Sequence, residues 1–108
     1  METNDIATAF VRYLTVDAGK TRPILIVRVR NDYVLAFKIT SKFSEKSRSI
    51  RKKYFQIKEW KEAGLRLPSW IDTNYAPLEI SIKPVGNSIG HLTEGDRIRF
   101  HTFLANRF

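Results

Sequence analysis

Two apolar runs joined by a short polar turn constrain this sequence more than any other feature. Residues 24–29 and 33–39 are rich in β-branched and aromatic side chains, and an Asn-Asp pair lies between them. This pattern predicts a β-hairpin. Arg22 just precedes the first strand, and Thr40 and Ser41 follow the second, so all three are expected near one end of the hairpin. A guanidinium beside hydroxyl groups is suited to phosphate chemistry.

The rest of the chain predicts further strands and two helices. Residues 1–9 are polar and are expected to fray, whereas apolar and polar residues alternate over 10–16, 69–73 and 78–82 and resume an extended pattern at 54–57. Proline cannot donate to a ladder, so Pro23 is expected at the first position of its strand. These patterns predict a mainly β domain.

Helical signals occur in two places. Residues 58–63 are good helix formers followed by Gly64, a typical C-terminal cap, and they predict one short internal helix. Thr93 and Asp96 resemble a capping arrangement before a last helix. That helix has an apolar stripe at helical spacing, typical of core or dimer contacts, and it consists of Phe100, Phe103, Leu104 and Phe108.

Size and charge limit the classes of function. The 108 residues suffice for a single domain spanning 1–108, and the formal charge of +8 favours a polyanionic or acidic partner. There are no cysteines and only two histidines, which excludes disulfides and disfavours a structural zinc site. The N-terminus lacks the basic and apolar regions of a signal peptide, and no run is long enough to span a membrane. The composition predicts a soluble cytoplasmic protein.

A basic run over residues 42–53 has two interpretations. Among several serines it has a single acid, Glu45. The run is either a solvated loop or a mobile arm that gathers RNA phosphates. Its basic residues are Lys42, Lys46, Arg48, Arg51, Lys52 and Lys53.

Several short motifs, taken in order, resemble the MazF/PemK family of toxins from type II toxin-antitoxin pairs. The resemblance begins at about Phe10 and continues to the end of the chain. It is carried by Arg22-Pro23 before an aliphatic strand, Ile39-Thr40-Ser41 one hairpin later, Ala63-Gly64-Leu65, Leu67-Pro68-Ser69-Trp70-Ile71, and Ile89-Gly90-His91-Leu92-Thr93 before the last helix.

The resemblance implies both fold and function. It implies a small SH3-like β-barrel and a homodimeric endoribonuclease that cleaves single-stranded RNA, needs no cofactor or metal, and is silenced by an acidic antitoxin. It also implies that Arg22 is the central catalytic group and Thr40 its partner, with Ser41 as a substitute or second donor. The basic residues expected to bind RNA are Lys20, Lys42, Arg48, Arg51, Lys52 and Lys53.

Two other classes of function remain open from the sequence. The chain could be a basic β-barrel that binds nucleic acid without cutting it, or a protein-interaction domain whose charge complements an acidic partner. His91 and His101 form no recognisable pair and are expected to be surface or packing residues. Ser69 lacks a nucleophile motif and is expected to be structural, and the scattered carboxylates disfavour a magnesium-dependent nuclease.

Overall fold

The chain folds into a curled antiparallel sheet with one long helix against it, seen in a computed structural model that describes residues 1–11, 20–83 and 85–107. The strands and helices follow one another as β1 (Asp5–Val11), β2 (Lys20–Val29), β3 (Tyr33–Thr40), α1 (Arg48–Arg51), β4 (Tyr54–Ile57), β5 (Ser69–Asp72), β6 (Leu78–Ser81), β7 (Val85–His91) and α2 (Glu94–Arg107). The mainly β class, with a short internal helix and a C-terminal helix, is confirmed.

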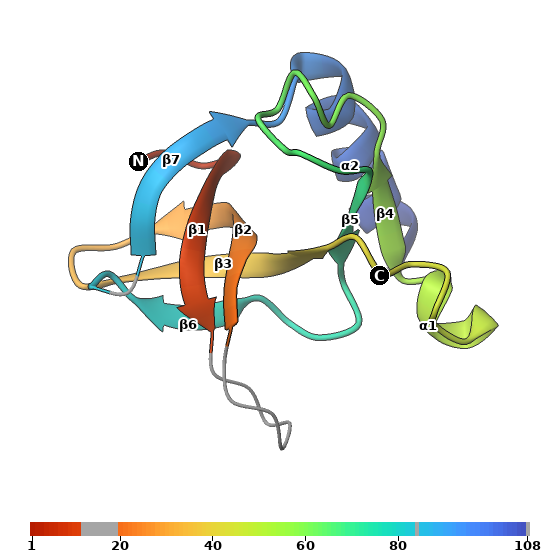
Figure 1. Cartoon of the computed structure of the whole chain (residues 1–108), viewed down its shortest axis with the longest axis horizontal. Coiled ribbons are helices and arrows are strands. Elements are labelled where there is room, and N and C mark those ends of the chain that lie inside the picture. The colour runs from red at the N-terminus through yellow and green to blue at the C-terminus, as the bar shows by residue number, and fades with distance from the viewer. Residues whose placement is uncertain (12–19, 84, 108) are drawn as a thin grey trace.

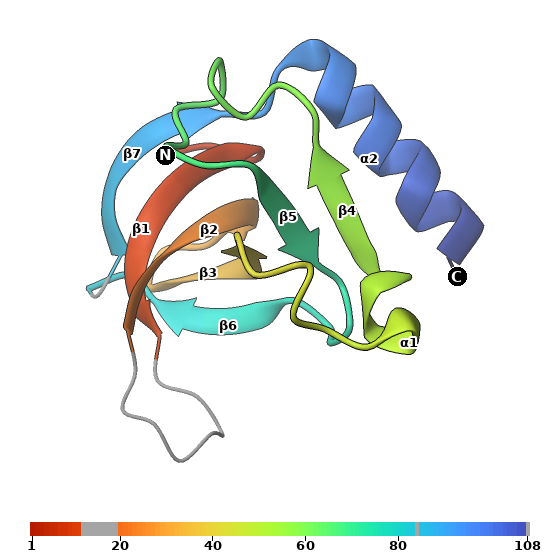
Figure 2. The same ribbon diagram turned by 45° about the vertical axis from the view of Figure 1, so that its right-hand side comes forward.

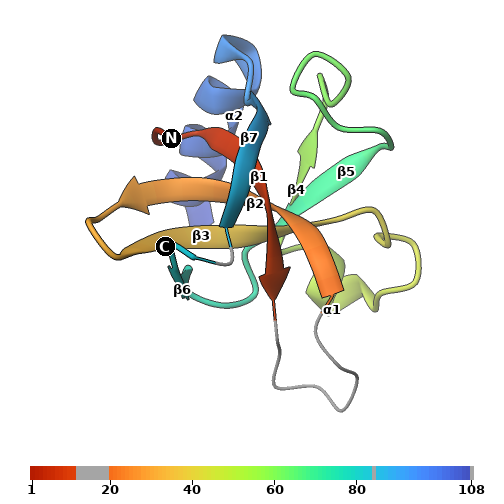
Figure 3. The ribbon, with the colours of Figure 1, turned by 60° about the vertical axis from the view of Figure 1, so that its left-hand side comes forward.

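The sheet is a half-barrel built around the predicted hairpin. Its strand order is β4-β5-β3-β2-β1-β7, and β6 also pairs with β3. In Figure 1, β7, β1 and β2 curve around one side, and α2 lies beside β4 and β5 on the other. Seen from the left-hand side, β4 and β5 splay away from β1 and β7 (Figure 3). This curvature is compatible with a small β-barrel.

Both faces of the hairpin are buried, which explains its continuous apolar runs. Leu25 packs in one cluster with residues of β3, β4, β5 and α2, whereas Ile24 and Ile26 pack in a second cluster with residues of β1, β3 and β6. Alternate residues of one strand therefore serve two cores. In Figure 2, α2 runs alongside β4. The ring of Phe100 on α2 packs edge-on against Phe37 and at a tilt against Phe55.

The N-terminal prediction was wrong in its position. Strand β1 begins at Asp5, inside the segment expected to fray, and Ile6, Ala7 and Ala9 are almost fully buried. Ile6 faces one core cluster and the two alanines face the other. The small alanine side chains give this stretch a weak apolar pattern in the sequence. In the fold, β2 and β7 pair with its two edges, and the two core clusters cover its two faces. Residues 12–16 of the predicted strand lie outside the described residues.

The internal helix is also displaced. Residues 58–63 form turns rather than a helix, and the one-turn helix is α1, where Ser47 Oγ accepts a hydrogen bond from the Ile50 N–H at 3.4 Å. The amides of Lys58 and Glu59 donate to buried Asp96 instead of continuing a helix. The Ala63 N–H donates to the Glu59 carbonyl at 3.1 Å and the Gly64 N–H to the Lys61 carbonyl at 3.0 Å, so the stretch forms successive turns.

Two smaller expectations also change. Pro23 lies inside β2 rather than at its start, opposite Thr8 of β1. The pairing of β2 with β3 begins only at Ile24, so β2 has one ladder neighbour at Pro23, as proline requires. Strand β7 was not predicted at all, because most of its side chains are exposed and polar or absent.

Candidate functional site

A cleft of about 620 Å³ lies at the end of the hairpin where β2 begins and β3 ends. Its walls come from five parts of the chain: β1, β7, the start of β2, the end of β3 with the loop after it, and the turn that leads into β5. The described residues that line it are Thr8, Thr21, Arg22, Pro23, Ile39, Thr40, Ser41, Lys42, Gly64, Leu65, Arg66, Leu67, Ser69 and Ile89.

Strand register brings Arg22 to Thr40. The outermost pair of β2 and β3 is Ile24 with Lys38, so Arg22 and Thr40 both lie two residues beyond the paired part of the hairpin, at its open end. Arg22 is partly buried, and its Nε is shielded from solvent. The expectation that Arg22, Thr40 and Ser41 lie together at one end of the hairpin is confirmed, because all three line the cleft.

Thr40 has a local role that leaves its proton available to a ligand. Its Oγ1 accepts a hydrogen bond from the backbone N–H of Lys42 at 3.1 Å, which closes a small turn after β3. A hydroxyl that accepts through oxygen still carries an O–H donor. The same turn places exposed Ser41 and Lys42 on the cleft wall.

The opposite wall depends on two glycines from distant motifs. Gly64 has φ +93°, and a Cβ there would lie 2.2 Å from the carbonyl oxygen of Ile89. A Cβ on Gly90 would lie 1.9 Å from the carbonyl oxygen of Ala63. The two backbones touch, which only glycine permits. The Ala63-Gly64-Leu65 and Ile89-Gly90-His91 motifs therefore meet in space and form one wall.

The residues after Gly64 complete that wall. Arg66 lines the cleft and was not identified from the sequence, where it is a single basic residue in a loop. Leu67 and Ile89 are 58% and 42% exposed and make an apolar rim. Ser69 is buried, and its Oγ donates to the Leu67 carbonyl at 2.8 Å, which confirms a structural hydrogen bond.

The cleft favours anions. Its described lining contains three cations, Arg22, Lys42 and Arg66, and five hydroxyl residues, but no aspartate or glutamate. A group of positive charges with no carboxylate among them attracts phosphate. The positive charges also repel one another. Over the described ranges, no three His, Asp or Glu residues cluster closely enough to hold a metal ion.

The buried side chain of Tyr54 on β4 lies beside Asp72, its ladder partner on β5. Lys38 Nζ lies 3.6 Å from Asp72 Oδ2 and 5.8 Å from the centre of the Tyr75 ring. Burial, and secondly the negative charge of Asp72, raise the pKa of Tyr54 to about 12, while the charge of Arg22 acts in the opposite direction. Tyr54 is therefore a neutral hydroxyl at physiological pH.

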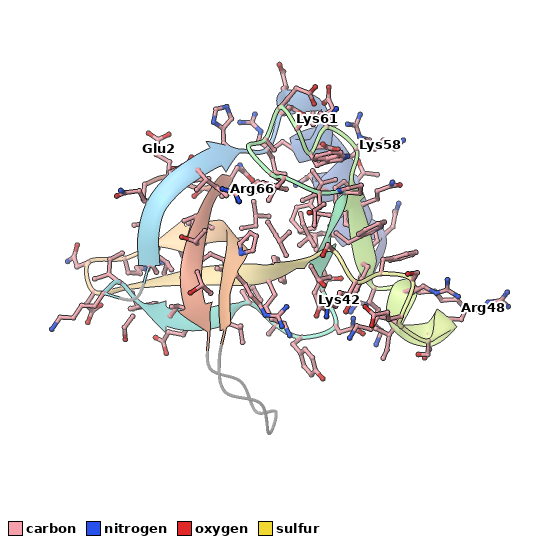
Figure 4. The ribbon with its side chains drawn as sticks, in the orientation of Figure 1. Glu2, Lys42, Arg48, Lys58, Lys61 and Arg66 are labelled. Atoms are coloured by element: carbon pink, nitrogen blue, oxygen red, sulfur yellow. The ribbon has the colours of Figure 1, made fainter. Side chains whose placement is uncertain are left out.

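The predicted RNA-binding residues divide into two groups. Lys42 lines the cleft, and Lys20 is the first residue of β2. The others belong to α1 and the residues after it, outside the described lining. Figure 4 shows Arg48 pointing away from the body of the protein at α1, whereas Lys42 lies closer to the sheet. Lys52 and Lys53 are exposed, and the guanidinium of Arg51 lies 5.6 Å from the centre of the Phe43 ring.

Both histidines lie on the surface. His91 ends β7 opposite Asp5 of β1, and His101 is exposed on α2. Neither is among the described residues of the cleft lining. The usual acid and base of neutral pH is therefore missing from that lining.

Comparison with protein-family models and with curated protein sequences finds no match to this chain. Within the described part of the chain, neither helix has the length and apolar character needed to cross a membrane. The cleft is therefore the feature of this chain that indicates a function.

Proposed function

We propose that this protein is an endoribonuclease that cleaves single-stranded RNA without a metal ion, in the manner its resemblance to MazF/PemK toxins implies. The observation that supports this most is the cleft itself, where Arg22 and Thr40 line one cavity with two further cations and no described acid. Such a cavity fits one phosphate of a polyanion.

The reaction is a transfer within the RNA backbone. The 2′-oxygen bonds to phosphorus and loses its proton, the bond from phosphorus to the 5′-oxygen breaks, and that leaving oxygen gains a proton. The products are a 2′,3′-cyclic phosphate and a 5′-hydroxyl. The pentacovalent intermediate carries extra negative charge on its phosphate oxygens, so preorganised donors accelerate the reaction.

Each residue has a separate task in this scheme. The forked guanidinium of Arg22 donates to two phosphate oxygens, and the hydroxyl of Thr40 donates to one, with Ser41 as a second donor. The high pKa of an arginine makes it a poor base in water. Proton transfer by Arg22 therefore rests on the family resemblance alone. Lys42 and Arg66 hold the neighbouring phosphates.

A second candidate function is nucleic-acid binding without cleavage. It is favoured by one observation: the described lining contains no His, Asp or Glu that could take the 2′ proton. In that case the same cations bind the backbone, but no bond is broken. Product analysis separates the two functions.

The partners we propose come from the resemblance and from charge. An acidic antitoxin segment would seek the same cations as RNA, and the apolar rim of Leu67 and Ile89 suits its hydrophobic side chains. The toxin would be a homodimer. Titration of the RNA-bound protein with an acidic antitoxin segment should release the RNA if the two ligands share the cleft.

The decisive experiment incubates the purified protein with a long unstructured RNA in EDTA and maps the cut sites and their termini. Cleavage in EDTA that leaves cyclic phosphate and 5′-hydroxyl ends is the expected result. A strict requirement for magnesium would contradict the mechanism, which would then have to use the carboxylates. RNA that is bound but uncut would support the second function.

A further inference from the structure

A parallel aromatic pair lies on the surface next to the cleft. The rings of Phe43 and Trp70 are 4.7 Å apart at an angle of 10°, and both side chains are half-buried. The described ring pairs that involve Phe100 belong instead to the buried core beneath α2. A stacked pair at the surface is therefore distinct from the core aromatics.

Both rings are tied to the cleft by sequence and by strand register. Trp70 of β5 is the ladder partner of Thr40, and directly paired residues of neighbouring strands present their side chains on the same face. Phe43 stacks on Trp70 and follows Lys42, which lines the cleft. The aromatic pair therefore adjoins the Thr40 side of the cleft.

A planar cation adjoins this pair. The guanidinium of Arg51 lies over the Phe43 ring, 5.6 Å from its centre, and Tyr54 packs against the same ring at 6.1 Å with a tilt of 49°. Stacked aromatic rings with an arginine plane are the surfaces on which unpaired nucleobases stack. An anionic peptide needs the cation but not the stacked rings.

We propose that Phe43, Trp70 and Arg51 form a nucleobase subsite, which takes the base of a nucleotide adjoining the phosphate held by Arg22 and Thr40. This inference rests on the proposed function and adds the part of the substrate that the cleft does not contact. The base continues the Phe43–Trp70 stack, and Arg51 supplies a further planar cation. Because every base has a π-face, the subsite accepts any base and favours large purines.

The test compares an oligonucleotide that has bases with one that lacks them. The probe is 2′-O-methyl oligoadenylate, which cannot be cleaved because its 2′-oxygens are blocked, and the reference is the same backbone with abasic sugars. We expect the wild type to bind oligoadenylate at least about fivefold more tightly. Phe43→Leu should lose most of this preference while binding the abasic backbone as the wild type does.

A matched control removes an aromatic residue from elsewhere. Trp60 also lies under a cation, with Lys61 Nζ 5.5 Å from its ring centre, but it is not among the described cleft residues. Trp60→Leu should keep the preference for bases. Thermal melting of both leucine variants separates loss of the subsite from loss of the fold.

A fluorescence measurement keeps the inference testable if Phe43→Leu unfolds. The chain has two tryptophans, so Trp60→Phe leaves Trp70 as the only reporter. Oligoadenylate should change the emission of Trp70, and the abasic backbone should not. Equal changes with polyglutamate and oligoadenylate would mark a surface for acidic protein and overturn the inference.

The outcomes distinguish this inference from the proposed function. Equal affinity of the wild type for both probes would overturn the nucleobase subsite but leave RNA cleavage standing. No binding of either probe, together with no cleavage of long RNA, would overturn both. A preference for bases that survives in folded Phe43→Leu would also overturn the subsite.

Discussion

Two polar regions of this protein use charge in opposite ways. At the start of α2, an anchor cluster consists of Glu59, Thr93, Asp96 and Arg99. The oxygens of fully buried Asp96 accept hydrogen bonds from the amides of Lys58 and Glu59 and from Arg99. Every charge there has an internal partner, so the cluster stabilises the fold.

The described lining of the cleft has a different composition. Its three cations come from different parts of the chain, and its described lining supplies hydroxyls but no carboxylate. Charge alone therefore does not identify a functional site. Balanced charge around a buried acid fixes one element to another, whereas charge of one sign in a cavity is suited to a ligand.

Replacement of Arg22 should produce the largest effect, and mainly on activity. Arg22→Ala removes a preorganised donor and should lower single-turnover cleavage by at least about 100-fold, with a loss of stability of no more than about 1 kcal/mol. Arg28→Ala is the matched control, because Arg28 is an exposed arginine of the same strand. Cleavage at the wild-type rate by folded Arg22→Ala would reduce the family resemblance to one of fold, and His91 or His101 would become candidates.

The anchor cluster should show the reverse behaviour. Asp96→Asn places an amide nitrogen beside the donating amides of residues 58 and 59 and should reduce the free energy of unfolding by about 2–3 kcal/mol. Urea unfolding measures this loss. Glu94→Gln, at an exposed acid in the same turn of α2, should cost far less. If Asp96→Asn were as stable as the wild type, the contrast between the two regions would fail.

Thr40 should have a smaller effect on activity than Arg22. Thr40→Ala removes one donor to a charged group and should slow cleavage by about tenfold. Thr40→Ser keeps the hydroxyl and should restore most of the rate. Single-turnover kinetics on both variants, beside their melting curves, would refute the donor role if serine and alanine were equally slow.

The basic residues after α1 test whether the RNA path extends beyond the cleft. Lys52→Gln with Lys53→Gln should lower the slope of log affinity against log salt by about 1.4, if each lysine contacts one phosphate of a single strand. The matched pair Arg28→Gln with Arg30→Gln removes two exposed charges, one in β2 and one directly after it, outside the described cleft lining. Equal slopes in the wild type and the lysine variant would mean that this segment is only a solvated surface.

The smallest effect concerns pH and Tyr54. Burial and Asp72 raise the pKa of Tyr54 to about 12 in the folded protein, above the ordinary value of 10.0. The stability that this neutral hydroxyl contributes is therefore complete below pH 10 and is lost as the pH rises towards 12. The free energy of unfolding, measured from pH 10 to pH 12, should fall less steeply with pH in Tyr54→Phe than in the wild type. Exposed Tyr75→Phe should follow the wild type.

Much of the fold could be predicted because its signals are local. The runs on either side of the Asn31-Asp32 turn carry a local hairpin pattern, and antiparallel pairing then places the start of β2 and the end of β3 at the same end of the hairpin. The predictions failed where side chains gave no pattern. β7 has an exposed glycine, asparagine and serine in succession and is held by pairing with β1, so its sequence is typical of a loop.

The sequence by itself determined the β class, the hairpin, the last helix and the excess of positive charge, because periodicity and composition act over short distances. Only the tertiary structure decided which charges meet. Gly64 and Gly90 let two backbones touch, and that contact brings Arg66 to the same cavity as Arg22. Asp96 likewise accepts hydrogen bonds from the amides of residues 58 and 59, which lie far from it in the sequence. Such contacts join residues far apart in the chain, so no local pattern contains them.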